Sequence, residues 1–450
     1  MSERHPGSAA AWFGGLGGYA RCMAAVGGDA LTVWVFQTGE VIPWAGDSGR
    51  PMRAANVTRA LLAAGHRVVL WTADFSHQHR THAYGRHTRL RVSDKLEVRF
   101  VHSRGYSRNV GPGRLFDHGQ LGLAMRRLLA EERPPDVAVV GYPPIEPAAT
   151  LTRWLRERDV PVLLDVKDTW PDVLLRAVPD SARPLGRALL DPYYRLSRRA
   201  ISDATGLSSM SDAFLEWALG VAGRARSDTD GVYPLTAPRA NLSDAELSAA
   251  GGWWDERGVP ADGRPRVVYI GALGTHFTPD TVAQAAAELP AHQFVIGGSG
   301  SREGAIAAQL AGLPNTLMPG WLDHARGEVL LRRATVVLAP YIDEPDFQAS
   351  IPNKFLDAFA HGLPIVTSIS GDVGRLVTDE DVGIHYGPAG PSLTQALVDL
   401  QTDAVGWQRR AANARSLYDS RFSYDIVYGA LVRHLERLAR GDGRGEADRG

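Results

Sequence analysis

The sequence predicts an α/β protein built from two doubly wound domains in tandem. Short apolar runs alternate with longer amphipathic stretches twice, first over residues 31–209 and again after Pro265. Continuous apolar runs of this kind are typical of strands buried on both faces of a parallel sheet. The 450-residue chain is also too long for one compact core and suits two domains.

The predicted strands and helices follow in order along the chain. In the first series the strands are residues 31–36, 68–71, 96–102, 137–141 and 160–166, and the helices include 52–64 and 117–130. In the second series the strands are residues 267–270, 293–296, 335–339 and 364–367. Further helices are expected at 393–402, 407–418 and 424–438.

These elements define a predicted domain plan. We expect a poorly ordered extension at 1–30, a first domain at 31–223 and a second domain at 266–422. Residues 224–265 combine charges, Gly, Pro and Ser with weak periodicity, as a linker does. A C-terminal helix at 423–439 and a disordered tail at 440–450 complete the plan.

Composition excludes several classes of protein. With 44% hydrophobic residues, 22% charged residues and a net charge of -1, the chain is typical of a soluble protein and not of a nucleic-acid binder or a disordered chain. Cys22 is the single cysteine, so an internal disulfide, a cysteine zinc cluster and a dithiol redox centre are excluded. We therefore expect a cytoplasmic protein.

Lysine is scarce in this chain. Lys95, Lys167 and Lys354 are the three lysines among 49 basic residues, and the others are arginines. Where arginine is used almost everywhere, a retained lysine favours a role that a planar, bulkier guanidinium does not fill.

Two glycine-rich turns follow predicted strands of the second domain. One contains Gly271 and Gly274, and the other contains Gly298, Ser299 and Gly300. Bare backbone at the carboxyl end of a parallel strand can approach a phosphate and bind it through amides. An ordinary strand-to-helix turn also uses glycine, so each turn alone leaves both interpretations open.

The stretch from Ser350 to Val366 predicts a helix with an unusual first turn. Ser350 can cap the helix and Pro352 suits its first turn. Lys354 then lies where a cation opposes the helix dipole, at a cost of a few tenths to ~1 kcal/mol. This cost indicates a bound anion, and the alternative is a solvated surface lysine.

The segment Ala358-Phe-Ala-His-Gly-Leu-Pro-Ile-Val resembles the donor-binding motif of the retaining group 1 glycosyltransferases, whose fold is GT-B, two Rossmann-like domains facing a central cleft. Further matching segments extend the resemblance over about residues 31–435: Gly65-His66, Tyr269-Ile-Gly271, Gly297-Gly-Ser-Gly300 and Leu313-Pro-Asn315. The resemblance implies a nucleotide diphosphate sugar as donor substrate and no other cofactor.

The resemblance also implies site residues and exposes departures. Asp357 takes the place of the family glutamate that holds the donor ribose, and Asn353 is expected in the same donor site. The Arg and Lys that bind the donor phosphates in the family are missing here, and Lys354 would replace their charge. The first family glutamate falls on Ala349, so its contact is absent or supplied by the acidic run 343–346. That run lacks a DXD-type triad, so we expect an acidic loop and no metal site.

Three groups in the first domain are candidate acceptor contacts. They follow the first, fourth and fifth strands and include these residues: Arg50, Arg53, Glu146, Lys167, Asp168 and Trp170. Together they resemble a subgroup of these enzymes encoded with bacterial surface-polysaccharide genes. The alternatives are a solvated helix start for the two arginines, a helix N-terminal carboxylate for Glu146 and a packed turn for Trp170. Lys167 and Asp168 favour function, because opposite charges after an apolar strand are costly unless paired or exposed to a cleft.

The resemblance therefore implies a retaining, metal-independent glycosyltransferase whose acceptor is a glycan, a lipid-linked glycan or a small metabolite. Lys354, Lys167 and Asp168 are the expected catalytic residues. A nucleotide-sugar 2-epimerase of the same fold and a noncatalytic sugar-nucleotide-binding protein are the alternatives. The arginines at 195, 198 and 199 allow peripheral contact with the inner membrane face, or else form a solvated helix face.

Overall fold

The computed structural model describes residues 29–45, 51–77, 79–107, 111–176, 178–239, 241–344, 348 and 350–441. Most of the predicted extension at 1–30 and the predicted tail beyond Gly441 lie outside the described residues. The chain forms two compact units. Unit 1 runs to Ala237 and resumes at Val427, and unit 2 is Pro238–Ile426.

Unit 1 contains an eight-stranded sheet in the order β10-β9-β8-β7-β1-β2-β6-β5. All neighbours are parallel except β5 and β6. The strands are β1 (Thr32–Phe36), β2 (Arg67–Ala73), β5 (Thr88–Arg91), β6 (Leu96–Val101), β7 (Val137–Tyr142), β8 (Val162–Val166), β9 (Gly206–Ser209) and β10 (Gly231–Val232), and β3 (Phe75–Ser76) with β4 (Thr81–His82) forms a separate hairpin.

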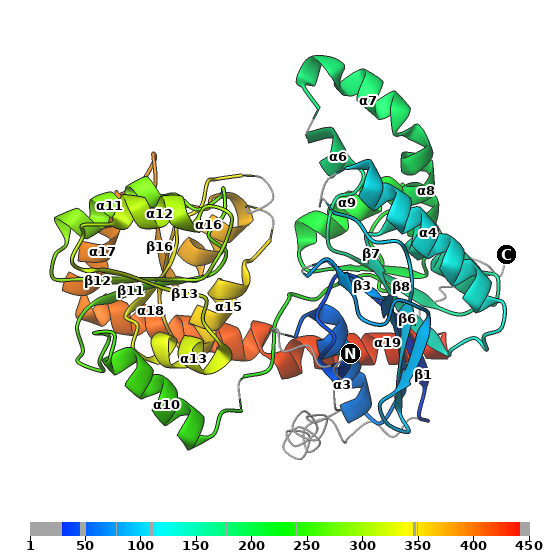
Figure 1. Cartoon of the computed structure of the whole chain (residues 1–450), viewed down its shortest axis with the longest axis horizontal. Coiled ribbons are helices and arrows are strands. Elements are labelled where there is room, and N and C mark those ends of the chain that lie inside the picture. Colours follow the sequence, from blue (N-terminus) through cyan, green and yellow to red (C-terminus); the bar gives the residue numbers. More distant parts are fainter. Residues whose placement is uncertain are drawn as a thin grey trace. The chain divides into compact units, whose positions relative to one another are not determined.

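The helices of unit 1 cover this sheet (Figure 1). They are α3 (Arg53–Ala63), α4 (Pro112–Leu129), α5 (Ile145–Arg156), α6 (Asp172–Arg176), α7 (Arg183–Leu189), α8 (Asp191–Ser202) and α9 (Asp212–Ala222), with short 3-10 turns at Pro43–Ala45 and Asp180–Ala182. Helix α19 begins at Tyr424, and from Val427 it belongs to unit 1.

Unit 2 contains a six-stranded parallel sheet in the order β13-β12-β11-β14-β15-β16. Its strands are β11 (Arg266–Ile270), β12 (Gln293–Gly297), β13 (Thr316–Gly320), β14 (Val336–Ala339), β15 (Ile365–Thr367) and β16 (Gly383–His385). Its helices are α10 (Asp244–Asp255), α11 (Pro279–Glu288), α12 (Glu303–Leu310), α13 (His324–Arg332), α15 (Asn353–Ala360), α16 (Gly371–Asp379), α17 (Leu393–Thr402) and α18 (Ala404–Leu417), and a π-helical segment spans Tyr418–Phe422.

Each face of the unit 2 sheet has its own apolar layer. Helices α11, α12 and α17 cover one face, and α10, α13, α15 and α18 cover the other (Figure 1). This two-sided coverage explains why the central strands are almost wholly apolar. The predicted class, two doubly wound Rossmann-like sheets, is confirmed.

The boundary between the units falls within the predicted linker 224–265. Before the boundary, β10 adds an edge strand to unit 1, and after it α10 packs against α13 in unit 2. Helix α19 completes unit 1, since the Tyr233 hydroxyl lies 2.7 Å from His434 Nδ1. A second link joins His66 Nε2 to Glu436 Oε1 at 3.1 Å. Within the described part of the chain, no helix combines the length and apolar character needed to cross a membrane.

Candidate functional site

The two glycine turns of unit 2 pack backbone against backbone. Gly271 N donates to Gly297 O at 3.0 Å, and Leu273 N donates to Ser299 O at 2.9 Å. A Cβ atom on Gly298, whose φ is +137°, would stand 1.8 Å from Gly271 O, and one on Gly300 would stand 2.4 Å from Leu273 O. Side chains at Gly298 and Gly300 are therefore incompatible with this arrangement.

The second turn offers fewer free amides than the sequence suggests. Gly298 N already donates to Gly320 O at 2.8 Å, which removes it from the expected phosphate-binding set. Ser299, Gly300 and Ser301 are exposed. Their amides donate no hydrogen bond to any described residue, so these three remain available to an anion.

Helix α15 begins at Asn353, and Pro352 occupies the N-cap position. The expected cap by Ser350 is wrong, because Pro352 stands between it and the helix and no side chain caps the helix. Asn353 is exposed at the start of the helix. Lys354 lies in the first turn, as the sequence predicts.

The Lys354 amine is buried beside the first glycine turn. Its side chain is 8% exposed, which excludes a solvated surface lysine. Nζ lies 3.7 Å from the centre of the Tyr269 ring and 4.3 Å from that of Tyr341, and it donates to the Tyr341 hydroxyl. A Cβ atom on Gly271 would lie 3.0 Å from Nζ, so the amine touches the turn itself.

Burial lowers the pKa of the Lys354 amine well below its ordinary value, and the half-buried carboxylate of Asp357 opposes this shift. An anion bound at the turn would restore the charged form. The amine is thus placed to respond to a ligand.

The acidic loop before α15 is held by α16. Asp343 accepts from Ser370 N at 3.0 Å, from Ser370 Oγ at 2.5 Å and from Gln348 Nε2 at 3.0 Å. Glu344 lies 3.4 Å from His276 Nδ1. Asp346 and Ala349 are outside the described residues. Asp343 therefore serves the loop's own structure.

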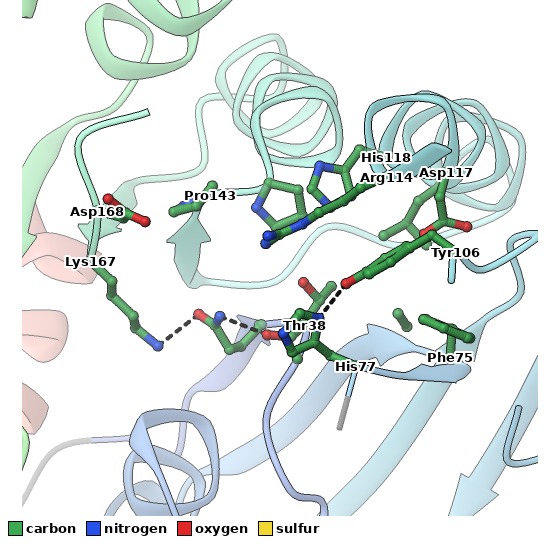
Figure 2. Close-up of a pocket in the computed structure, with 15 residues that line it drawn as sticks. Thr38, Phe75, His77, Tyr106, Arg114, Asp117, His118, Pro143, Lys167 and Asp168 are labelled. Carbon is green, nitrogen blue, oxygen red and sulfur yellow. Dashed lines mark hydrogen bonds between the residues drawn. The ribbon is translucent and has the colours of Figure 1, made fainter. Parts of the chain in front are cut away.

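A pocket of about 240 Å³ lies in unit 1, at the carboxyl ends of β1, β2, β7 and β8 and beside the start of α4 (Figure 2). This edge is where ligands bind in open α/β sheets. Figure 2 shows Lys167 and Asp168 on one side and Tyr106, Arg114 and His118 on the other.

Lys167 and Asp168 each have partners other than one another. Lys167 Nζ donates to Glu40 Oε1 at 2.6 Å and to Gln37 Oε1 at 2.8 Å. Asp168 accepts from its neighbour Thr169 N at 2.8 Å and from Trp170 Nε1 at 3.1 Å. Both side chains line the pocket in fixed orientations, so the structure brings these two predicted residues together.

Arg53 is a buried cation, not an acceptor-side or solvated arginine. It is 2% exposed, its Nε lies 3.1 Å from Asp165 Oδ2, and it donates to Tyr233 O. Its guanidinium also lies over the Tyr428 ring. Such a pair is costly to break, and its burial keeps the guanidinium away from the surface. Arg50 lies outside the described residues.

Trp170 and Glu146 do not line the pocket. Trp170 is 5% exposed and packs beneath the Arg114 guanidinium, 4.9 Å from its ring centre. Glu146 accepts from the Tyr193 hydroxyl, and burial raises the pKa of its carboxyl. The packed-turn interpretation therefore holds for Trp170.

Sequence reasoning missed the other side of the pocket, formed by His77, Tyr106, Arg114 and His118. A signal was present for Arg114. Arg114 lies in the first turn of α4, and Lys354 lies in the first turn of α15. Neither first turn contains an acidic residue.

One group of described side chains has the donor types of a metal site. The candidate ligand atoms of Asp74, His82 and His102 all lie within 4.8 Å of one another. Asp74 already accepts from Tyr84 N at 2.7 Å, Gly85 N at 3.0 Å and His102 Nδ1 at 2.9 Å. This carboxylate is therefore satisfied by the surrounding loop without an ion.

Comparison with known proteins assigns both units. Residues 264–403 match the family described as glycosyl transferases group 1, and residues 48–232 match the glycosyl transferase 4-like domain. Glycogen synthase from Mycobacterium tuberculosis is 28% identical over 191 residues, which are 41% of this chain and 45% of that protein. The match thus spans less than half of this relative's length.

Solved structures share the fold along almost the whole chain. Sucrose-phosphate synthase from Thermosynechococcus elongatus has a TM-score of 0.65 at 16% identity, covering 91% of this chain and 99% of that one. HepE from Anabaena in complex with UDP-glucose has a TM-score of 0.59 at 14% identity, covering 90% and 99%. The two family matches, one in each unit, and these likenesses agree with the sequence motifs, and the chain belongs to the group 1 glycosyltransferases of GT-B fold.

Proposed function

We propose that this chain transfers a sugar from a nucleotide diphosphate donor to an acceptor, with retention of configuration at the anomeric carbon. The observation that carries the proposal is the Lys354 amine, buried among tyrosine rings and touching the glycine turn that follows β11. An amine held against bare backbone at this edge, and charged when an anion binds, suits a phosphate.

The proposed donor site uses fixed charges and dipoles. The leaving diphosphate gains negative charge as the glycosidic bond breaks, and Lys354 with the amides of Ser299, Gly300 and Ser301 would stabilise it. One well-placed donor of this kind contributes ~2.7 to 4 kcal/mol. Asp357 would bind the ribose, and no metal takes part.

The proposed acceptor site is the unit 1 pocket. Asp168 would accept a hydrogen bond from an acceptor hydroxyl, since the Trp170 and Thr169 donors fix its carboxylate. Lys167, held by Glu40, would donate to an acceptor oxygen. A glycan, as in surface-polysaccharide assembly, a lipid-linked glycan and a small metabolite all offer such hydroxyls.

A cytoplasmic location with peripheral contact at the inner membrane face completes the proposal. Helix α7 presents Leu185 and Leu189, which are 66% and 73% exposed, beside Arg183 and Arg187. Exposed leucines flanked by arginines suit an anionic lipid surface. The fraction of protein that sediments with anionic vesicles should fall when both leucines become serine. An unchanged fraction would contradict the proposed membrane contact.

A thermal-shift screen of nucleotide sugars tests the donor class. UDP-glucose is the first candidate, because HepE was solved with it. At about 100 times its Kd, a ligand adds ~2.7 kcal/mol of stability, a readily measured shift. Turnover of the stabilising donor without an acceptor would indicate a 2-epimerase, and binding without turnover across an acceptor panel would indicate a noncatalytic binding protein.

A further inference from the structure

One end of the unit 1 pocket is electropositive. Helix α4 begins there with Pro112-Gly-Arg-Leu after the N-cap Gly111, without a side-chain cap or an acidic residue in its first turn. A helix N-terminus carries about half a positive charge, and Arg114 in that turn adds a full one. Both charges attract an anion to this end of the pocket.

The Arg114 guanidinium is held in place by its neighbours. Its central carbon lies 4.9 Å from the centre of the Trp170 ring and 5.8 Å from that of Tyr106. Its Nε donates to His118 Nε2 at 3.4 Å. Stacking on aromatic faces preorganises the planar fork that binds oxyanions.

The two neighbouring imidazoles are kept neutral. Burial, followed by the charge of Arg114 and by His77, lowers the pKa of His118 to about 3. Burial, followed by Arg114 and Arg80, also lowers the pKa of His77. His77 Nδ1 lies 2.5 Å from the Tyr106 hydroxyl, and both side chains line the pocket. These groups add hydrogen-bonding capacity without negative charge.

One acidic side chain, Asp117, also lines this end of the pocket, and it is bound to the backbone. Asp117 is buried and accepts from Gly105 N at 2.6 Å. The half-buried carboxylate of Asp168 lies on the opposite side of the pocket (Figure 2). The pocket therefore has two chemically distinct ends, one where Asp168 stands beside the paired amine of Lys167 and suits hydroxyls, and a cationic one at Arg114 that suits an anion.

We propose that the acceptor is a sugar that carries a phosphate ester, with its ring hydroxyls toward Asp168 and its phosphate against Arg114, His77 and Tyr106. The inference rests on the proposed function, since it assumes that this pocket takes the acceptor. The guanidinium donates from one side, and the His77–Tyr106 pair, whose mutual hydrogen bond leaves it one N–H or O–H to donate, approaches from another. This arrangement suits a tetrahedral group with several terminal oxygens. A soluble sugar phosphate and a sugar linked through diphosphate to a lipid share this chemistry.

Binding to the full chain without any nucleotide sugar tests the proposal. Calorimetry should show that glucose 6-phosphate binds at least tenfold more tightly than glucose. Arg114→Gln should weaken glucose 6-phosphate binding by about 10- to 100-fold, the scale for a hydrogen bond to a charged group. Arg126→Gln, an exposed position on the same helix and outside the pocket, should bind like the parent.

A second variant protects the test against misfolding. His77→Gln leaves the stacking of Arg114 on Trp170 untouched, and it should weaken binding by about 3- to 10-fold. Equal affinities of the parent for glucose and glucose 6-phosphate would overturn the proposal. Parental affinity in folded Arg114→Gln would overturn it as well.

Transfer assays separate the two phosphate sources and the two hypotheses. One assay offers glucose 6-phosphate in solution as acceptor, and the other offers a prenyl diphosphate sugar in vesicles. Arg114→Gln should lower the rate of transfer to whichever of the two acceptors the parent uses. Efficient transfer to neutral sugars that does not depend on Arg114 would refute the phosphate inference and keep the transferase function. Phosphate-dependent binding without transfer to any acceptor would refute the function and keep the subsite.

Discussion

Replacing Lys354 by methionine tests the proposed donor site with little change in shape. Methionine has an unbranched chain of similar length and no amine. Lys354 is buried against Tyr269 and Tyr341. Burial already lowers the pKa of this amine, so removing it should leave the free energy of unfolding unchanged or raise it.

The structure sets the size of the kinetic effect. Nζ touches the glycine turn, so a phosphate on that turn would carry its charge about 4 Å away, where two unit charges interact by about 4 kcal/mol at an effective dielectric constant of about 20. This agrees with the ~2.7 to 4 kcal/mol measured for single electrostatic donors, or a loss of about 10² to 10³ in turnover. Lys354→Arg should recover part of the loss at most, because its planar fork differs from a compact ammonium.

Steady-state transfer at saturating donor is the assay for this variant. Lys95→Met is the matched control, because Lys95 is exposed and its amine donates to the Gly65 carbonyl in unit 1. The control should keep parental turnover. Parental turnover in Lys354→Met, with unchanged donor affinity, would show that the amine takes no part in stabilising the diphosphate.

Three further predictions address other groups. Asp168→Asn should lower transfer much more than donor affinity, and calorimetry beside rate measurements would contradict this if affinity fell while saturated transfer stayed normal. Activity should persist in EDTA, so a loss that Mg²⁺ or Mn²⁺ restores would refute metal independence. The hydrogen bond with His361 lowers the pKa of Glu328 to about 2, although burial opposes this shift. Burial lowers the pKa of His361, but the hydrogen bond with Glu328 outweighs it and the pKa of the imidazole is raised. The carboxylate's contribution to stability is present above pH ~4.5 and lost as pH falls through about 2, while the imidazolium's is present below pH ~6.5 and lost at higher pH. His361→Gln should therefore lower the unfolding free energy most near pH 5.5, by about 1 to 2 kcal/mol, and a deficit in thermal melts that does not shrink toward pH 9 would contradict the pairing.

The central strands could be predicted because their own residues determine them. All six residues of β7 are buried, and the apolar run 137–141 already indicated a strand there. The edge strands could not be predicted in this way. β10 has two residues and exists because Gly231 pairs with Ser208 on β9, which itself lacks an apolar run. Such strands depend on the backbone of a neighbour that folding brings close.

In the site, too, only the features that local sequence determines could be predicted. The position of Lys354 in the site could be predicted from local features, namely the scarcity of lysine and the start of a helix. The partner of Lys167 did not, because Glu40 is 127 residues away in the sequence. Arg53 was misjudged for the same reason, since Asp165, Tyr233 and Tyr428 enclose it from distant segments. A charged residue's burial depends on partners that local pattern does not identify.

The stereochemistry of the product tests the central claim most directly. Proton NMR should follow the reaction of UDP-glucose, or of the donor found by screening, with a sugar phosphate acceptor. For an α-linked donor, an α-linked product and free nucleoside diphosphate should appear together and in equal amounts. A β-linked product would contradict retention, and a 2-epimerised sugar released without acceptor would contradict transfer itself.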